Sequence, residues 1–268
     1  FIPEEYWDLF ADLAGDAGTL RMQVTRANDQ KYRPGSQQES DATLAALNSA
    51  SFTIAKREDK PTTSKPSKPF ITSTLQQAAS TRLSFSVKKT MMMAQRLYEA
   101  GYITYMRTDS TNLSADAVAD CRQYIDKKYG AAYLPETPIL YSSKEGAQEA
   151  HEAIRPSDVN VMPSDIVKID PDGVRLYELI WRQFVACQMT KAEFTSTSLV
   201  AKAGDFELRT SGRVIRFDGF TRVQPPMSKK EEDRVLPDFK QGDSLTLKKL
   251  DPSQHFTKPT ARYSEAAL

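Results

Sequence analysis

Apolar residues recur at two different spacings along this chain of 268 residues, and the change of spacing divides the chain into three parts. In the first and last parts, apolar and polar positions alternate, which predicts strands. These strands are expected at residues 20–24, 52–54, 194–200, 206–208, 214–217 and 245–247. Asp218 and Gly219 are predicted to form a hairpin turn, and residues 39–50 read as a helix.

The middle part carries apolar residues at helical spacing. Thr74 and Gln77 fit a capping box, which predicts a helix over residues 75–82. After residues 84–86, a second helix runs to Gly101, which supplies a left-handed stop. Its predicted buried face contains Val87, Met91, Ala94, Leu97 and Tyr98. Two helices joined by such a tight turn are a candidate helix-turn-helix.

Three more helices are predicted further along the chain. Ser114 caps one that ends at Gly130, with Ala115, Val118, Cys121, Ile125 and Tyr129 on its buried face. A proline-marked loop over 135–144 precedes a short helix at 145–150, which the chain leaves through residues 151–156. Asp170 caps and Pro171 opens the last helix, over residues 171–189.

Residues 59–69 contain three prolines and three lysines, so we expect an extended connector and a domain boundary there. The predicted fold is therefore α+β and multidomain. Residues 1–65 and 192–268 form a β-rich domain, and the second of these segments also begins a further domain. Residues 66–191 form an inserted, mostly α-helical domain.

Composition limits the possible functions only weakly. The net charge of +1 argues mildly against a nucleic-acid partner. A local basic stretch could still neutralise several phosphates, or could be a solvated face without a partner; it contains Lys60, Lys65, Lys68, Arg82, Lys88, Lys89, Arg96 and Arg107. No run approaches the length of a membrane span, which predicts a soluble protein. Cys121 and Cys187 are expected to be core thiols in a reducing compartment, because two cysteines support neither a disulfide framework nor a zinc ribbon.

Candidate chemistry lies between Gly101 and Leu113, where Tyr105 stands two residues before Arg107 and four before Asp109. A phenol with a pKa near ~10 is a poor nucleophile at neutral pH unless positive charge lies beside it. In an extended segment, residues two apart face the same side, which would place Tyr105 and Arg107 over one phosphate. Taken alone, an ordinary amphipathic tyrosine would be the favoured interpretation.

Neighbouring motifs favour a nucleophilic Tyr105 over an ordinary amphipathic tyrosine. The run TLQQAASTRL begins at Thr74, KKTMMMAQRLYEAG begins at Lys88, and EAHEAIRPSD begins at Glu149. In this order and at these separations, they resemble the bacterial type IA DNA topoisomerases. The runs DKPTTSKP from Asp59 and HFTKPTARYSE from His255 extend the resemblance over the whole chain.

The resemblance implies an arch-shaped fold and a reaction. Tyr105 would attack a DNA phosphodiester and hold the 5′-phosphate while a strand passes through the break, which relaxes negative supercoils without ATP. Arg107 would stabilise the pentacoordinate phosphate. His151 would contact the DNA backbone near the tyrosine.

The remaining site residues have less defined roles. Asp109 either orients Arg107 or forms a turn. Arg155 either binds a phosphate or pairs with Glu152, which would orient it. Arg82, Lys88 and Lys89 are predicted to bind DNA, with single strands preferred. The expected location is the bacterial cytoplasm, at the nucleoid.

The family also has an N-terminal Toprim domain that holds Mg²⁺, and nothing in this sequence resembles it. The Asp170-Pro-Asp172 run reads as a turn that opens a helix. We therefore expect an excised fragment that binds DNA but does not cleave it alone. A tyrosine recombinase is set aside, because there the tyrosine follows the basic cluster, whereas Tyr105 precedes His151. A non-catalytic DNA-binding module built on the helix-turn-helix stays open for the isolated chain.

Overall fold

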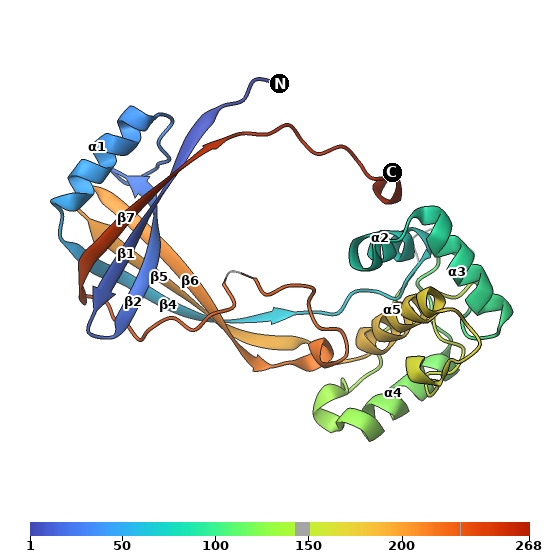
Figure 1. Ribbon diagram of the computed structural model, residues 1–268. Coiled ribbons are helices and arrows are strands. Elements are labelled where there is room, and N and C mark those ends of the chain that lie inside the picture. Colours follow the sequence, from blue (N-terminus) through green and yellow to red (C-terminus); the bar gives the residue numbers. More distant parts are fainter. Residues whose placement is uncertain (143–150, 231) are drawn as a thin grey trace. The chain divides into compact units, whose positions relative to one another are not determined.

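The computed structural model describes residues 1–142, 151–230 and 232–268, and it divides into two compact units. Unit 1 comprises Phe1–Thr62, Phe194–Arg216 and Lys229–Ala261. Unit 2 comprises Thr63–Glu193, Phe217–Ser228 and Arg262–Leu268. Figure 1 shows that strands dominate unit 1 and helices dominate unit 2. Each unit is therefore built from segments that are distant in the sequence.

One sheet of seven strands forms most of unit 1, with the order β1-β7-β4-β5-β6-β2-β3 in the described part of the chain. The strands are β1 Glu5–Gly15, β2 Gly18–Ala27, β3 Gln30–Lys31, β4 Phe52–Ser64, β5 Ala192–Ala203, β6 Phe206–Phe217 and β7 Ser244–Phe256. Strand β1 pairs antiparallel with β7 and also with β2, so the sheet closes on itself. Strands from both flanks of the helical region thus share one sheet.

The core of unit 1 follows from the alternation of side chains along these strands. Leu9, Ala11 and Leu13 of β1 are buried, and they cluster with buried residues of β2, β4, β5 and β6. Helix α1 (Gln37–Asn48) starts at Ser36, whose side chain accepts a hydrogen bond from the Glu39 amide. The helix adds fully buried Leu47 to the same cluster.

Four α-helices form unit 2 in its described residues: α2 Thr72–Leu83, α3 Val87–Glu99, α4 Ala115–Tyr129 and α5 Pro171–Cys187. Helix α5 is its centre, because most of its side chains are buried and it contacts both α2 and α3. Four short 3-10 helices lie at Ala131–Tyr133, Pro163–Asp165, Gly219–Arg222 and Glu265–Ala267. None of the described helices is long and apolar enough to cross a membrane.

Most of the predicted elements are present. Strands include every segment predicted as extended, and all five described α-helices overlap a predicted one. Ser114 and Asp170 cap α4 and α5 as predicted, and Gly101 has a positive φ of 81°. The helix predicted at 145–150 lies outside the described residues. The free cysteines Cys121 and Cys187 are both buried.

Several boundaries were wrong. Helix α2 begins at Thr72 after Ile71, and the Thr74 hydroxyl accepts a hydrogen bond from the Ile71 amide from inside the first turn. Strand β4 extends to Ser64, so only residues 65–69 remain as the connector. Strand β1 was missed because its first half mixes acidic and aromatic residues.

The predicted hairpin at Asp218–Gly219 was also wrong. Strand β6 is continuous through both segments predicted there, and Gly219 begins a 3-10 helix. The reversal between β5 and β6 occurs instead at Gly204, which has a φ of 59°. Two helix faces also differ from the prediction, since Ala115 and Tyr98 are exposed.

Candidate active site around Tyr105

Residues 102–112 follow α3 as an irregular segment with several bends, and from Tyr105 to Ser110 exposed and buried residues alternate. Met106, Thr108 and Ser110 are buried, whereas Tyr105, Arg107 and Asp109 are exposed. The Tyr105 side chain is 48% exposed, and its ring meets that of Tyr98 edge-on at 5.2 Å between centroids. Tyr105 and Arg107 are therefore both accessible to solvent, while the residue between them is buried.

Two neighbouring segments hold this stretch in place. On one side, the Thr72 amide at the start of α2 donates to the Thr108 carbonyl at 3.0 Å. On the other side, the Thr104 amide donates to the Arg155 carbonyl at 2.9 Å, and the Thr104 hydroxyl donates to the Ala153 carbonyl at 2.7 Å. The tyrosine segment is thus fixed between a helix start and the motif that contains His151.

A cavity of about 650 Å³ opens at the first turn of α2. Arg107, Asp109 and His151 line it together with Thr72, Ser73 and Gln76. Within the described residues, the side chains of Arg107, Asp109 and His151 form no hydrogen bond or ion pair. The structure thus brings these three predicted residues together, whereas Tyr105 is not among the residues that line the cavity.

Two sources of positive charge face this cavity, the N-terminus of α2 and the side chain of Arg107. The first turn of α2 contains no acidic residue, so the partial positive charge of the helix N-terminus is not offset within the helix. The Arg107 guanidinium adds a permanent charge. An anion such as a phosphate is the kind of group that this arrangement can bind, with Asp109 as the single acidic side chain in the lining.

A larger cavity of about 1100 Å³ runs along α2 and shares Ile71 and Ser73 with the first one. Lys68 and Arg82 contribute positive charge to it, and Asp109 also reaches it. Arg82 is exposed and forms no ion pair with any described residue. Of the residues predicted to bind DNA, Arg82 and the equally exposed Lys88 therefore have side chains available to a ligand.

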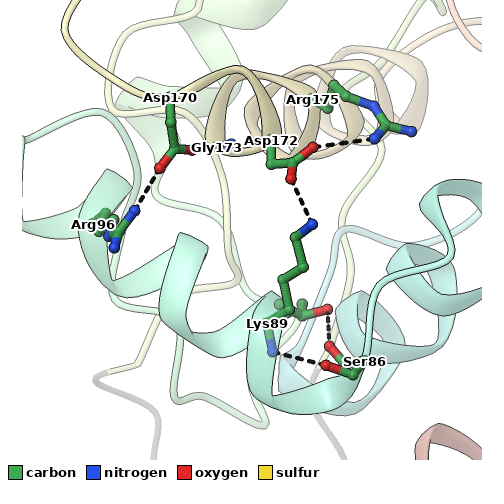
Figure 2. A network of polar contacts seen from close by, with 8 residues as sticks. Ser86, Lys89, Arg96, Asp170, Asp172, Gly173 and Arg175 are labelled. Carbon is green, nitrogen blue, oxygen red and sulfur yellow. Dashed lines mark hydrogen bonds and ion pairs between the residues drawn. The ribbon is translucent and has the colours of Figure 1, made fainter.

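Lys89 lies in a different environment. Its ammonium group is 2.5 Å from an Asp172 carboxylate oxygen and 4.5 Å from the centre of the Phe85 ring. Figure 2 shows how Lys89 and Arg96 of α3 reach Asp172 and Asp170 at the start of α5. The hydrogen bond from Lys89 lowers the pKa of Asp172. These ion pairs connect two helices of unit 2, so Lys89 already has a structural partner.

The same contacts explain the Asp170-Pro-Asp172 run. Asp170 accepts a hydrogen bond from the Gly173 amide at 2.9 Å and thereby caps α5. Across the residues described, no group of three or more His, Cys, Asp or Glu side chains is arranged to hold a metal ion. The described residues therefore do not fit a Mg²⁺ site.

Arg155 pairs with Glu152, at 2.6 Å between Nε and Oε2, and also donates to the Pro156 carbonyl at 3.0 Å. Its side chain is only 14% exposed. Of the two partners considered for Arg155, the structure shows Glu152. This pair stabilises the turn that follows His151.

Sequence reasoning missed Thr72 and Thr104, whose hydroxyl groups connect the tyrosine segment to its two neighbours. It also missed the contact between Tyr98 and Tyr105. Threonine is common at helix starts and in turns, so the sequence carries no signal for these roles. They depend on partners 34 and 49 residues away.

Comparison with known proteins identifies the family of the chain. Residues 1–268 match the DNA topoisomerase family over their whole length. The chain therefore belongs to the bacterial type IA DNA topoisomerase family.

Its relatives include proteins named DNA topoisomerase 1 from Pseudomonas aeruginosa and Escherichia coli, which are 62% and 60% identical over the whole chain. The chain spans about a third of their length, namely 31%. A solved structure of full-length topoisomerase I from Thermotoga maritima matches 99% of the chain with a TM-score of 0.81 and 30% identity. That match covers 43% of the Thermotoga protein.

Proposed function

We propose that this chain supplies the nucleophile of a type IA DNA topoisomerase and that Tyr105 is that nucleophile. The observation that carries the proposal is that Tyr105 and Arg107, two residues apart, are both exposed and that Arg107 lines one cavity together with His151. Membership of the family supports it. The substrate is then DNA, and the proposed outcome is relaxation of negative supercoils.

In the proposed reaction, the Tyr105 phenol oxygen attacks a backbone phosphorus and loses its proton. A new bond forms between phosphorus and the tyrosine oxygen, while the bond from phosphorus to the 3′-oxygen breaks and that oxygen takes up a proton. The product is a 5′-phosphotyrosine and a free 3′-hydroxyl. After another strand has passed, the 3′-hydroxyl reverses the reaction, and no ATP is required because a phosphoester bond is kept throughout.

Arg107 is proposed to stabilise the negative charge that develops on the phosphate oxygens. Its guanidinium group is permanently charged and has no partner among the described residues, so it is free to bind a phosphate. His151 is proposed to contact the backbone phosphate from the same cavity. Asp109 is proposed to orient Arg107.

DNA approach is proposed to use the basic side chains Arg82 and Lys88, which form no ion pair with a described residue. They lie near the end of α2 and the start of α3, the two helices of the predicted helix-turn-helix. Single-stranded DNA is the proposed preferred form. Its backbone is more flexible than that of a duplex, so a phosphodiester can more easily reach the side chains of residues 102–112. The bacterial nucleoid is the proposed location.

Cleavage is proposed to need Mg²⁺, held by a Toprim domain outside these 268 residues. Bound there, the ion would help to position the scissile phosphate. The described residues instead supply the nucleophile and positive charge. The chain alone is accordingly proposed to bind an oligonucleotide without cutting it.

A chimera tests the proposal. Residues 1–268 replace the matching 269 residues of the Pseudomonas aeruginosa relative, which provides the rest of a complete enzyme. With Mg²⁺, the chimera should relax supercoiled DNA, and denaturing gels should show protein linked to a 5′-phosphate. Tyr105→Phe should abolish this adduct and keep DNA binding. Arg107→Ala should lower the cleavage rate far more than the affinity.

Two results would contradict the proposal. One is a chimera that does not relax DNA, and the other is an adduct that survives in Tyr105→Phe. Full relaxation activity in Tyr105→Phe would additionally favour a role for this segment in DNA binding alone. Cleavage by residues 1–268 without any added domain would contradict the proposed need for Toprim.

A further inference from the structure

Arg107 has an exposed side chain but a tightly held backbone. No described residue forms a hydrogen bond or ion pair with its guanidinium group. The residues on either side, Met106 and Thr108, are both buried. The direction in which Arg107 leaves the chain is therefore set by its two flanking peptide groups and not by contacts of the guanidinium.

Thr72 contacts both of these peptide groups. Its hydroxyl oxygen lies 2.7 Å from the Met106 carbonyl oxygen and 2.9 Å from the Thr108 amide nitrogen. A hydroxyl has one proton to donate and lone pairs to accept with. It can therefore donate to Met106 and accept from Thr108 at the same time, which joins the peptide before Arg107 to the peptide after it.

The donor assignment follows from the distances. The Thr108 carbonyl oxygen is also within 3.1 Å of the Thr72 hydroxyl, but it already accepts the Thr72 amide at 3.0 Å. The Thr72 hydroxyl proton is therefore assigned to the Met106 carbonyl, which is the nearer of the two acceptors. All three hydrogen bonds come from one residue at the first position of α2, a rigid element.

We infer that Thr72 is a positioning residue for Arg107 in the cleavage step, an inference that rests on the proposed function. Thr72 acts by fixing the two peptide groups that aim the guanidinium toward the scissile phosphate. Transition-state stabilisation depends on donors that are already in place, and displacements of about 1 Å can cost about 10²-fold in rate. The hydroxyl, and not the bulk of the side chain, carries the effect.

The test uses the chimera and three substitutions. Thr72→Val keeps the shape but removes the hydroxyl, whereas Thr72→Ser keeps the hydroxyl. Thr90→Val is the matched control, because Thr90 is a buried threonine of α3 whose hydroxyl, among the described residues, bonds only to the carbonyl of Ser86, the cap of the same helix. The cleavage rate is measured in single turnover, and affinity is measured separately in a Tyr105→Phe background that cannot react.

Thr72→Val should lower the cleavage rate about 10²-fold while the dissociation constant for DNA changes less than about twofold. Thr72→Ser and Thr90→Val should cleave at rates within about threefold of the unsubstituted chimera. A Thr72→Val enzyme with normal cleavage overturns the inference. So does a loss of affinity that accounts for the whole effect, because Thr72 would then bind DNA directly.

A double substitution tests whether Thr72 acts through Arg107. In an Arg107→Ala background, Thr72→Val should have little further effect on the rate, since the group that it positions is absent. Independent, multiplicative effects overturn the inference. Failure of the proposed function is distinguishable, because it shows as an adduct in Tyr105→Phe, whereas every result that overturns only this inference leaves Tyr105→Phe without an adduct.

Discussion

Met106 offers a direct test of how firmly the tyrosine segment is anchored. Its side chain is fully buried between exposed Tyr105 and exposed Arg107. Truncation of a buried methionine to alanine costs about 2 to 5 kcal/mol, with the larger values where the surroundings cannot collapse into the cavity. The Met106 carbonyl is held by Thr72, so little collapse is available. We therefore expect Met106→Ala to destabilise unit 2 by about 3 kcal/mol.

The two tryptophans allow each unit to be followed separately. Trp181 is buried in α5 of unit 2, and Trp7 lies in β1 of unit 1. In a Trp7→Phe background, urea unfolding followed by fluorescence reports on unit 2 alone. With a slope of about 2 kcal/mol per molar urea, a loss of about 3 kcal/mol lowers the midpoint by about 1.5 M. Following the units separately matters because a chain with two units need not unfold in one step.

Met92→Ala is the control, because Met92 belongs to α3 but is 45% exposed. It should change stability by no more than about 0.5 kcal/mol. A midpoint shift for Met106→Ala that is no larger than the shift for Met92→Ala would refute the reasoning. It would mean that the segment bearing Tyr105 and Arg107 is not anchored by the packing of Met106.

Two further predictions concern charge and burial. Lys88→Ala should reduce the slope of log affinity against log salt by about 0.7 for a single-stranded oligonucleotide, whereas Lys89→Ala should leave it unchanged because Lys89 is paired with Asp172. Titrations at several salt concentrations measure both slopes, and the reverse order would contradict the assignment. Burial raises the pKa of the Cys187 thiol to about 12 and that of Cys121 well above its usual value, so both thiols should stay protonated at pH 8 and react with a thiol reagent only after unfolding in urea. Rapid labelling of the native chain would contradict this.

Local sequence was sufficient for most of the secondary structure. Helices α3, α4 and α5 begin at Ser86, Ser114 and Asp170, because each side chain accepts a hydrogen bond from an amide of the first turn. Period-two alternation located most strands for a similarly local reason. Predictions failed where the deciding partner was distant, as with the 3-10 helix that begins at Gly219. A side chain there would clash with the Lys191 backbone, so this position depends on tertiary contacts.

In the candidate site, too, some features follow from local sequence and others from contacts between distant residues. The sequence by itself singled out Tyr105, Arg107 and Asp109, whose spacing of two predicts a common exposure, and all three are exposed while the residues between them are buried. Motif resemblance pointed to His151, but only the tertiary structure placed it in one cavity with Arg107. Tertiary contacts likewise decided that Lys89 pairs with Asp172 and that Thr72 holds the peptides beside Arg107. Hydrogen bonds and ion pairs depend on distances of a few ångströms between atoms, and between residues far apart in the chain those distances are set only when the helices and loops pack.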